Sequence, residues 1–262
     1  MFLQRTFIVF TVCSLIAACK NETPKAPVSQ DLRVTIQRDS VRKCVRDSSC
    51  VEVVVEFPQL EGGPNAQATV AINDSLKKAV LGNHFNLPLR QAIDSTVAML
   101  STDLAEQLKM ADDPTYSTTY YDSGTGQITW QSPKFVTSSY SYATYNGGAH
   151  GMYAVVLTTY DLQTGRVLNL TDIISDTTAL RPLLEKHIVL TKQAEDSTLN
   201  NLKEMLFDPE SPVDLPVNYA IVKEGVSFVY NPYEIMAYAY GITEFTITWE
   251  ELGKLADRNK WF

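Results

Sequence analysis

A glycine-rich segment with one histidine is the strongest candidate for chemistry in this sequence. Residues 145–151 read YNGGAHG and lie between two segments that are typical of β-strands. An imidazole exposed on such a turn could act as an acid, a base or a hydrogen-bond donor. The alternative is a buried, hydrogen-bonded turn residue that holds two strands together. The neighbouring sequence implies no partner carboxylate, so on residue chemistry alone we favour the structural role for His150.

Tyrosines form the second candidate site. Tyr140 and Tyr142 fall on one face of the strand expected over residues 134–144, so their rings can stack along it. Tyr145 begins the glycine-rich segment, and Tyr233 and Glu234 follow a proline later in the chain. Sugars bind flat aromatic rings, and protein partners use tyrosines as hot spots. We therefore treat these five residues and His150 as candidate ligand-binding residues, with cross-strand packing as the alternative.

Other chemistries have no signature here. The three histidines, His84, His150 and His187, are far apart and show no metal-ligand spacing. We expect His187, which shares a helix face with leucines, to be a satisfied histidine at the edge of the core. The chain has neither a Gly-x-Ser-x-Gly elbow nor a phosphate-binding glycine loop. We expect no metal, no cofactor and no catalytic residue that can be named, although 30 Asp and Glu residues permit an accidental acid–base pair.

The first nineteen residues predict export. Arg5 precedes a short apolar run, and small residues then lead to Cys19 and the polar Lys20. This is the order of a secretory signal, and it is too short for a stable membrane span. A cysteine directly after Ala17-Ala18 resembles the lipobox of bacterial lipoproteins, which implies cleavage before Cys19 and lipid attachment to it. We expect a signal peptide at 1–18 and a lipidated flexible tether at 19–32, with membrane attachment through lipid alone.

Two cysteines remain for the folded part. Cys44 and Cys50 flank a polar loop between β-prone segments, so they could bridge a hairpin in an oxidising compartment. Closing so short a loop would stabilise the fold by about 2 kcal/mol on the chain-entropy model. Two free thiols are the alternative, and we favour the disulfide.

Charge narrows the choice of partner. The formal net charge is −8, and removing the signal segment makes it one unit more negative. An acidic chain lacks the basic patch that nucleic-acid phosphates demand, so we expect no nucleic-acid partner. The same charge would attract a basic protein.

Hydrophobic periodicity predicts an α+β protein with mixed or antiparallel sheets, a few packed helices and two sub-domains. Six apolar residues spaced by three or four form one continuous helical stripe: Leu89, Ile93, Val97, Leu100, Leu104 and Leu108. Other helices are expected over residues 70–80, ended by Gly82, and from residues 178–182 onward. Strands are expected at 33–38, 50–57, 127–131, 134–144, 152–160, 219–223, 226–230 and 244–249. Residues 122–126 (DSGTG) and 161–165 (DLQTG) resemble hairpin turns, and residues 248–251 (TWEE) resemble a capping box.

The same segments resemble known families. YNGGAHG, the following strand and YDLQTG at 160–165, LNLTDI at 168–173, VSFVY at 226–230 and NPYEI at 231–235 resemble the C-terminal domain of the RsiV-like family. The preceding part, with FPQL at 57–60 and IND at 72–74, is similar to the domain of unknown function found in PdaC-like proteins. The resemblance implies an extracellular α+β fold, with a PdaC-like domain at 33–144 and an RsiV-like domain at 145–262. In RsiV the equivalent region binds lysozyme, and in PdaC it accompanies a separate deacetylase domain.

Three functions follow. We favour an envelope-anchored, non-catalytic module that binds glycan such as peptidoglycan, or a basic protein such as lysozyme. A glycan hydrolase or deacetylase centred on His150 is the enzymatic alternative, and a structural envelope lipoprotein is the third. Lys20, after the lipidated cysteine, favours the outer membrane by analogy with lipoprotein sorting in enterobacteria.

Overall fold

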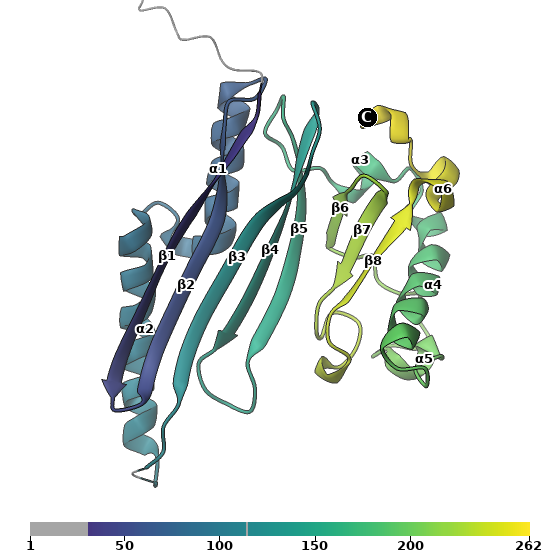
Figure 1. The fold of residues 1–262 in the computed structure, drawn as a ribbon. Coiled ribbons are helices and arrows are strands. Elements are labelled where there is room, and N and C mark those ends of the chain that lie inside the picture. Colours follow the sequence, from purple (N-terminus) through teal and green to yellow (C-terminus); the bar gives the residue numbers. More distant parts are fainter. Residues whose placement is uncertain (1–30, 114) are drawn as a thin grey trace, which may run out of the picture.

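The chain folds into two sub-domains, each built on its own β-sheet (Figure 1). The structure, a computed structural model, describes residues 31–113 and 115–262. The expected signal segment, Cys19 and most of the tether lie outside these residues. One sheet has five strands and is mixed, and the other has three antiparallel strands. The predicted α+β class with two sub-domains is confirmed.

The larger sheet has the strand order β1-β2-β3-β4-β5. Only β2 and β3 pair in parallel, because α1 and α2 carry the chain back across the sheet between them. The elements are β1 Arg33–Arg46, β2 Ser49–Glu61, α1 Ala66–Leu81, α2 Leu89–Met110, β3 Thr119–Gln131, β4 Phe135–Tyr145 and β5 Met152–Asp161.

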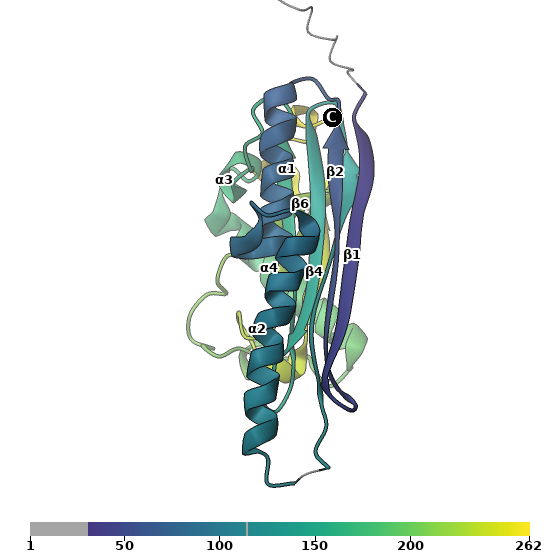
Figure 2. The ribbon, with the colours of Figure 1, turned by 90° about the vertical axis from the view of Figure 1, so that its left-hand side faces the viewer.

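Helices α1 and α2 lie in one layer over a single face of this sheet (Figure 2). The predicted stripe of α2 forms the contact, and its members from Ile93 to Leu108 are buried. They pack against valines and Phe57 on the inward face of β2. Apolar side chains that repeat every 3.6 residues on the helix and every two residues on the strand therefore pack together in one core. The predicted helix at residues 89–108 is confirmed.

Strands β1 and β2 form a long hairpin that the disulfide closes. Cys44 is paired with Cys50 across the two strands and bonded to it, as predicted. Both strands are longer than the expected segments. The residues of β1 are paired with those of β2 along almost the whole length of the hairpin. Three arginine–glutamate pairs at 3.5–3.6 Å link the exposed side chains of the two strands: Arg33–Glu61, Arg38–Glu56 and Arg42–Glu52.

One predicted hairpin turn is wrong, and the other is confirmed. Residues 122–126 lie inside β3 rather than in a turn. At these positions glycine is required by close packing and not by a reversal of the chain. The Tyr140 side chain occupies the space beside Gly124, and Pro58 occupies the space beside Gly126. Residues 161–165 do turn, with Gly165 at φ 72° and Asp161 accepting hydrogen bonds from the backbone of the turn.

The smaller sheet has the order β6-β7-β8 and is covered by α4 (Figure 1). Its elements are α3 Leu170–Ile173, α4 Thr177–Glu195, α5 Leu202–Met205, β6 Asn218–Ile221, β7 Gly225–Tyr230, β8 Thr243–Thr248 and α6 Trp249–Leu252. Buried threonines connect it to the larger sheet: Thr137 Oγ1 donates to the Ile221 carbonyl at 2.8 Å, and the Ile221 amide donates to Thr159 Oγ1 at 3.0 Å. The two sub-domains are thus joined through their strands.

His187 is a satisfied histidine at the edge of this second core, as predicted. Its ring stacks on Phe245 at 5.5 Å, and Nε2 lies 3.1 Å from Glu251 Oε1. Glu251 also belongs to the predicted capping box with Thr248. The pKa of Glu251 is lowered to about 2, mainly by the hydrogen bond from Lys186, and the hydrogen bond with His187 acts in the same direction.

Candidate functional site

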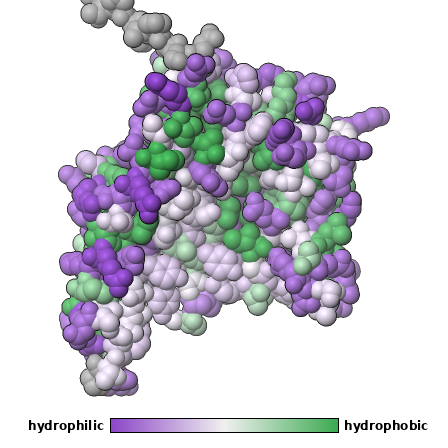
Figure 3. Space-filling view, in the orientation of Figure 1, coloured by the Kyte–Doolittle hydropathy of each residue, from purple (hydrophilic) through white to green (hydrophobic). Residues whose placement is uncertain are grey.

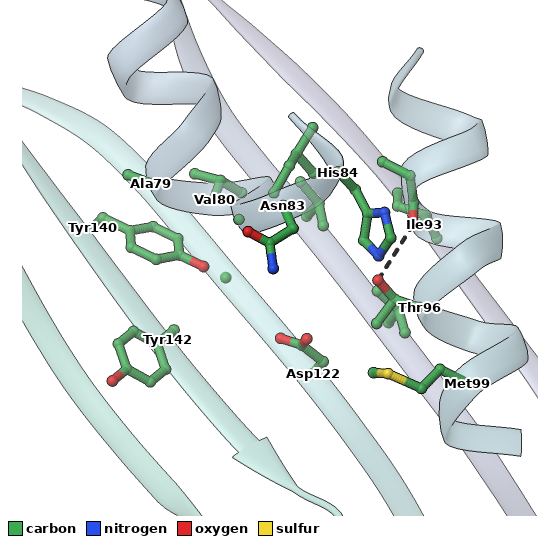
Figure 4. A pocket seen from close by; sticks show the side chains of 16 residues that line it. Ala79, Val80, Asn83, His84, Ile93, Thr96, Met99, Asp122, Tyr140 and Tyr142 are labelled. Carbon is green, nitrogen blue, oxygen red and sulfur yellow. Dashed lines mark hydrogen bonds between the residues drawn. The ribbon is translucent and has the colours of Figure 1, made fainter. Parts of the chain in front are cut away.

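A cavity lies between the inward face of the larger sheet and the junction of α1 with α2 (Figure 4). Its volume is about 420 Å³, and sixteen residues line it. The lining comes from α1, the short 3₁₀ turn Gly82–His84, the first half of α2, and strands β2, β3 and β4. A cavity of this size is in the range of small-molecule binding pockets.

Glycine residues create the cavity. Gly82 ends α1 with φ 51°, a conformation that favours glycine, and turns the chain so that Asn83 and His84 reach the lining. On the sheet, Gly124 has no side chain, and the ring of Tyr140 lies over its backbone. Any larger residue at 124 would displace that ring. The absence of a side chain at residue 124 therefore leaves room for the Tyr140 ring against the sheet.

Tyr140 and Tyr142 form the wall of the cavity on β4. Their ring centroids are 5.9 Å apart and the planes are inclined by 28°, so the rings stack as expected for neighbours on one strand face. Both side chains are partly buried. Burial raises the pKa of the Tyr140 phenol, with further effects from Asp122 and Tyr142. The phenol is therefore neutral at physiological pH.

Among the lining residues that the structure describes, Asp122 supplies the only carboxylate. It is partly buried, and its carboxylate points into the space that Asn83 enters from the opposite side (Figure 4). Within residues 31–113 and 115–262, no hydrogen bond or ion pair is found for this carboxylate. Desolvation by burial raises the pKa of Asp122, because the charged form loses water without gaining a protein partner.

The remaining polar groups of the lining are a hydroxyl, an imidazole and an amide, besides the tyrosine phenols. Thr96 on α2 donates its hydroxyl to the Ala92 carbonyl at 3.3 Å (Figure 4). His84 and Asn83 offer an imidazole and an amide. The cavity thus combines aromatic faces, an unpaired carboxylate and several hydrogen-bonding groups.

His150 lies elsewhere, in the loop between β4 and β5. It is exposed, so the expectation of a buried turn residue is wrong. Gly147 and Gly148 have φ values of 103° and 91°, and the loop they form carries the histidine beyond the sheet. The ring stacks on Tyr238 of the second sub-domain at 4.0 Å, and Nδ1 lies 2.9 Å from the Gly151 carbonyl.

Tyr233 and Glu234 lie in the loop that follows β7. Tyr233 is 49% exposed, has φ 70°, and its hydroxyl lies 3.4 Å from His150 Nε2. Glu234 instead accepts hydrogen bonds at 3.2 Å from the amides of Asn218 and Asn231. The Asn231 side chain also forms two hydrogen bonds with the backbone of Val155 on β5. Through Asn231, Glu234 therefore helps to fix the loop against β5.

The surface around His150 is rich in aromatic residues. Tyr145 packs on Tyr121 with ring centroids 6.0 Å apart, and its hydroxyl donates to the Gly148 carbonyl at 3.1 Å. Tyr153 contacts Tyr238 edge to face at 5.5 Å. Figure 3 shows the sheet face turned away from α1 and α2, where residues of intermediate hydropathy cover the region near the β4–β5 loop.

The predicted binding residues therefore divide between two places. Tyr140 and Tyr142 line the cavity, whereas His150 and Tyr233 meet outside it. Sequence reasoning missed Asp122, Gly124 and His84. The alternation of Asp122, Gly124 and Gly126 was the available signal, because a period of two places all three on one strand face.

The described residues contain neither a candidate metal site nor a candidate membrane-spanning helix. Residues 31–113 and 115–262 contain no group of three or more His, Cys, Asp or Glu side chains placed to hold a metal ion. In the same part of the chain, no helix has the length and apolar character needed to cross a membrane.

Family models match two successive segments of the chain. The model described as deacetylase PdaC matches residues 44–153, and the model described as a protein of unknown function, DUF3298, matches residues 171–250. A PdaC-like domain precedes a DUF3298 domain. The cavity lies within the PdaC-like domain. His150 of the PdaC-like domain contacts Tyr238 of the DUF3298 domain.

Solved structures share this arrangement. A DUF3298 family protein from Bacteroides fragilis superposes with a TM-score of 0.67 at 22% identity, over 86% of this chain and 94% of the other. One from Pseudomonas aeruginosa gives a TM-score of 0.57 at 18% identity, over 88% and 97%. At these identities the likeness establishes the fold of the PdaC-like and DUF3298 domains together. No curated protein matches the chain.

Proposed function

We propose that this chain is an envelope-anchored, non-catalytic module that binds a glycan unit in the cavity of its PdaC-like domain. One observation carries the proposal: the stacked Tyr140–Tyr142 pair and the unpaired Asp122 face the same cavity of about 420 Å³. Sugar rings present C–H faces that pack on aromatic rings, and their hydroxyl groups donate to carboxylates. The lining offers both kinds of contact.

Binding to soluble oligosaccharides tests this function. Calorimetric titration of the purified protein would use oligomers of N-acetylglucosamine, glucosamine and glucose, together with soluble peptidoglycan fragments. We expect at least one of these classes to bind, and Tyr142→Ala to weaken that binding about tenfold through loss of a stacking face. Tyr233→Ala, a tyrosine outside the cavity, is the matched control and should bind as the wild type does. If no class binds, the glycan-binding function is wrong.

Anchoring by lipid is the second part of the proposal. The signal-like segment and the cysteine that follows Ala17-Ala18 support it, and the disulfide fits an oxidising compartment outside the cytoplasm. Lys20 favours the outer membrane. Cys19→Ala should release the protein from membranes without unfolding the domain. A wild-type protein that incorporates no palmitate, together with a variant that still fractionates with membranes, would contradict the anchor.

A basic protein such as lysozyme is a second candidate ligand, at a different place. The exposed His150, Met152 and Tyr233 resemble the aromatic and methionine-rich composition of protein interfaces. The likeness of residues 145–262 to the RsiV-like domain and the acidic net charge add support. Pull-down of lysozymes by the wild type, and loss of capture in Tyr233→Ala but not in Tyr142→Ala, would establish this alternative.

The enzymatic alternative has less support. His150 contacts a backbone carbonyl and a tyrosine hydroxyl, not a carboxylate that would orient it as a general base. Support for a deacetylase comes only from the description of the family model that matches residues 44–153. We therefore assign the chain to binding rather than to catalysis.

A further inference from the structure

The cavity carries a negative charge that its own lining does not balance. Asp122 is the one acidic side chain among the sixteen lining residues that the structure describes, and neither lysine nor arginine lines the cavity with it. Among the described lining residues His84 is the only basic group, and no ion pair is found between it and the Asp122 carboxylate. Burial raises the pKa of the Tyr140 phenol, which is therefore neutral at physiological pH.

This charge restricts the ligand. An anionic group would be repelled by Asp122 and would find no lysine or arginine in the described lining. A metal ion such as Ca²⁺ takes six to eight oxygen ligands, often from several carboxylates, and the lining has one carboxylate. An organic ammonium group needs only one carboxylate, and tyrosine faces add cation–π attraction.

We propose that the cavity selects a sugar unit with a free amino group, a hexosamine whose ammonium group pairs with Asp122 beside the ring of Tyr142. This inference rests on the proposed glycan-binding function and narrows its substrate class. The ammonium group restores the partner that the partly buried carboxylate lacks. An N-acetylated hexosamine presents a neutral amide instead and leaves the charge of Asp122 unbalanced.

The test compares two oligosaccharides that differ only in acetylation. Calorimetric titration of the purified protein would use glucosamine and N-acetylglucosamine oligomers of equal length, at moderate salt and a pH where the amine is protonated. We expect the free amine to bind at least about tenfold more tightly, a ratio typical of one partly buried charged hydrogen bond. Asp122→Asn should abolish this preference.

Asp94→Asn is the matched control. Asp94 is an exposed carboxylate on α2 outside the cavity lining, so its loss changes the net charge as Asp122→Asn does. The control should keep the preference, which separates pairing at Asp122 from general attraction of cations to an acidic protein. Loss of the preference in both variants would overturn the inference.

The outcomes separate the inference from the function beneath it. Equal binding of both oligomers, or tighter binding of the acetylated one, contradicts amine selection and leaves glycan binding intact. Absence of binding to either oligomer or to any neutral sugar contradicts both. Unfolding of Asp122→Asn would be detected by circular dichroism, and Asp122→Ser then repeats the test without the charge.

Discussion

The ring of Tyr140 occupies the space that a side chain at residue 124 would fill. A Cβ atom on Gly124 would lie 2.8 Å from Cε2 and Cζ of Tyr140, closer than real Cβ contacts allow. The two residues are diagonal neighbours on β3 and β4, since Gly124 is paired with Tyr142 and Tyr140 is paired with Gly126. A glycine on one strand and a tyrosine on the next thus shape the floor of the cavity together.

This relationship predicts the effect of Gly124→Ala. The added methyl group must displace the Tyr140 ring, so we expect the free energy of unfolding to fall by about 1–3 kcal/mol. In Gly124→Ala/Tyr140→Ala the clash is absent, and the double variant should be more stable than the sum of the single effects predicts. Urea unfolding of the four proteins measures the coupling. Strictly additive effects would show that the ring does not depend on Gly124.

Asp122 predicts a pH dependence of stability. Burial raises the pKa of its carboxyl in the folded state, so the folded protein holds this proton at pH values where the unfolded chain has lost it. Asp122 therefore lowers the stability as the pH rises above the ordinary carboxyl pKa and through the folded value. We expect Asp122→Asn to be more stable than the wild type at neutral pH, with the difference disappearing as the pH falls below the unfolded value.

Urea unfolding across the pH range measures this difference, and Asp94→Asn provides the control. Asp94 is exposed, so its variant should track the wild type. A wild type that is more stable than Asp122→Asn at neutral pH would mean that the carboxylate has a favourable partner.

The disulfide between Cys44 and Cys50 predicts a loss of stability on reduction. Opening this short loop should lower the free energy of unfolding by about 2 kcal/mol on the chain-entropy model. Mass spectrometry without reduction should find the peptide that spans both residues lighter by two hydrogens. A reductant should leave the stability of Cys44→Ala/Cys50→Ala unchanged. Two alkylatable thiols at these positions in native protein would contradict the bond.

Truncation of His150 and of His187 should change the stability by different amounts. His150 is exposed and contacts the surface of Tyr238, so His150→Ala should change the free energy of unfolding by about 0.5 kcal/mol or less. The side chain of His187 is only 14% exposed and contacts both Glu251 and Phe245. His187→Ala should therefore cost about 1–3 kcal/mol. Equal losses in the two variants would mean that His150 supports the fold as His187 does.

Local patterns were sufficient for several elements. The spacing of apolar residues from Leu89 to Leu108 predicts α2 because only a helix places them on one face. The capping box at Thr248 and Glu251 and the turn at residues 161–165 depend on side chains bonding to nearby backbone. The disulfide joins two cysteines six residues apart in a hairpin. Each of these structures is determined by residues close together in the sequence.

The cavity depends on contacts between distant segments. Gly82 and His84 come from the end of α1, Asp122 and Gly124 from β3, and Tyr140 from β4. The sequence by itself predicted the strand that carries Tyr140 and Tyr142, but it favoured a turn at residues 122–126, because glycines serve turns and close approaches equally well. Only the register of β3 against β4 places Tyr140 over Gly124 and leaves Asp122 unpaired in the cavity. Register is a property of paired strands, so the tertiary structure alone decided the site.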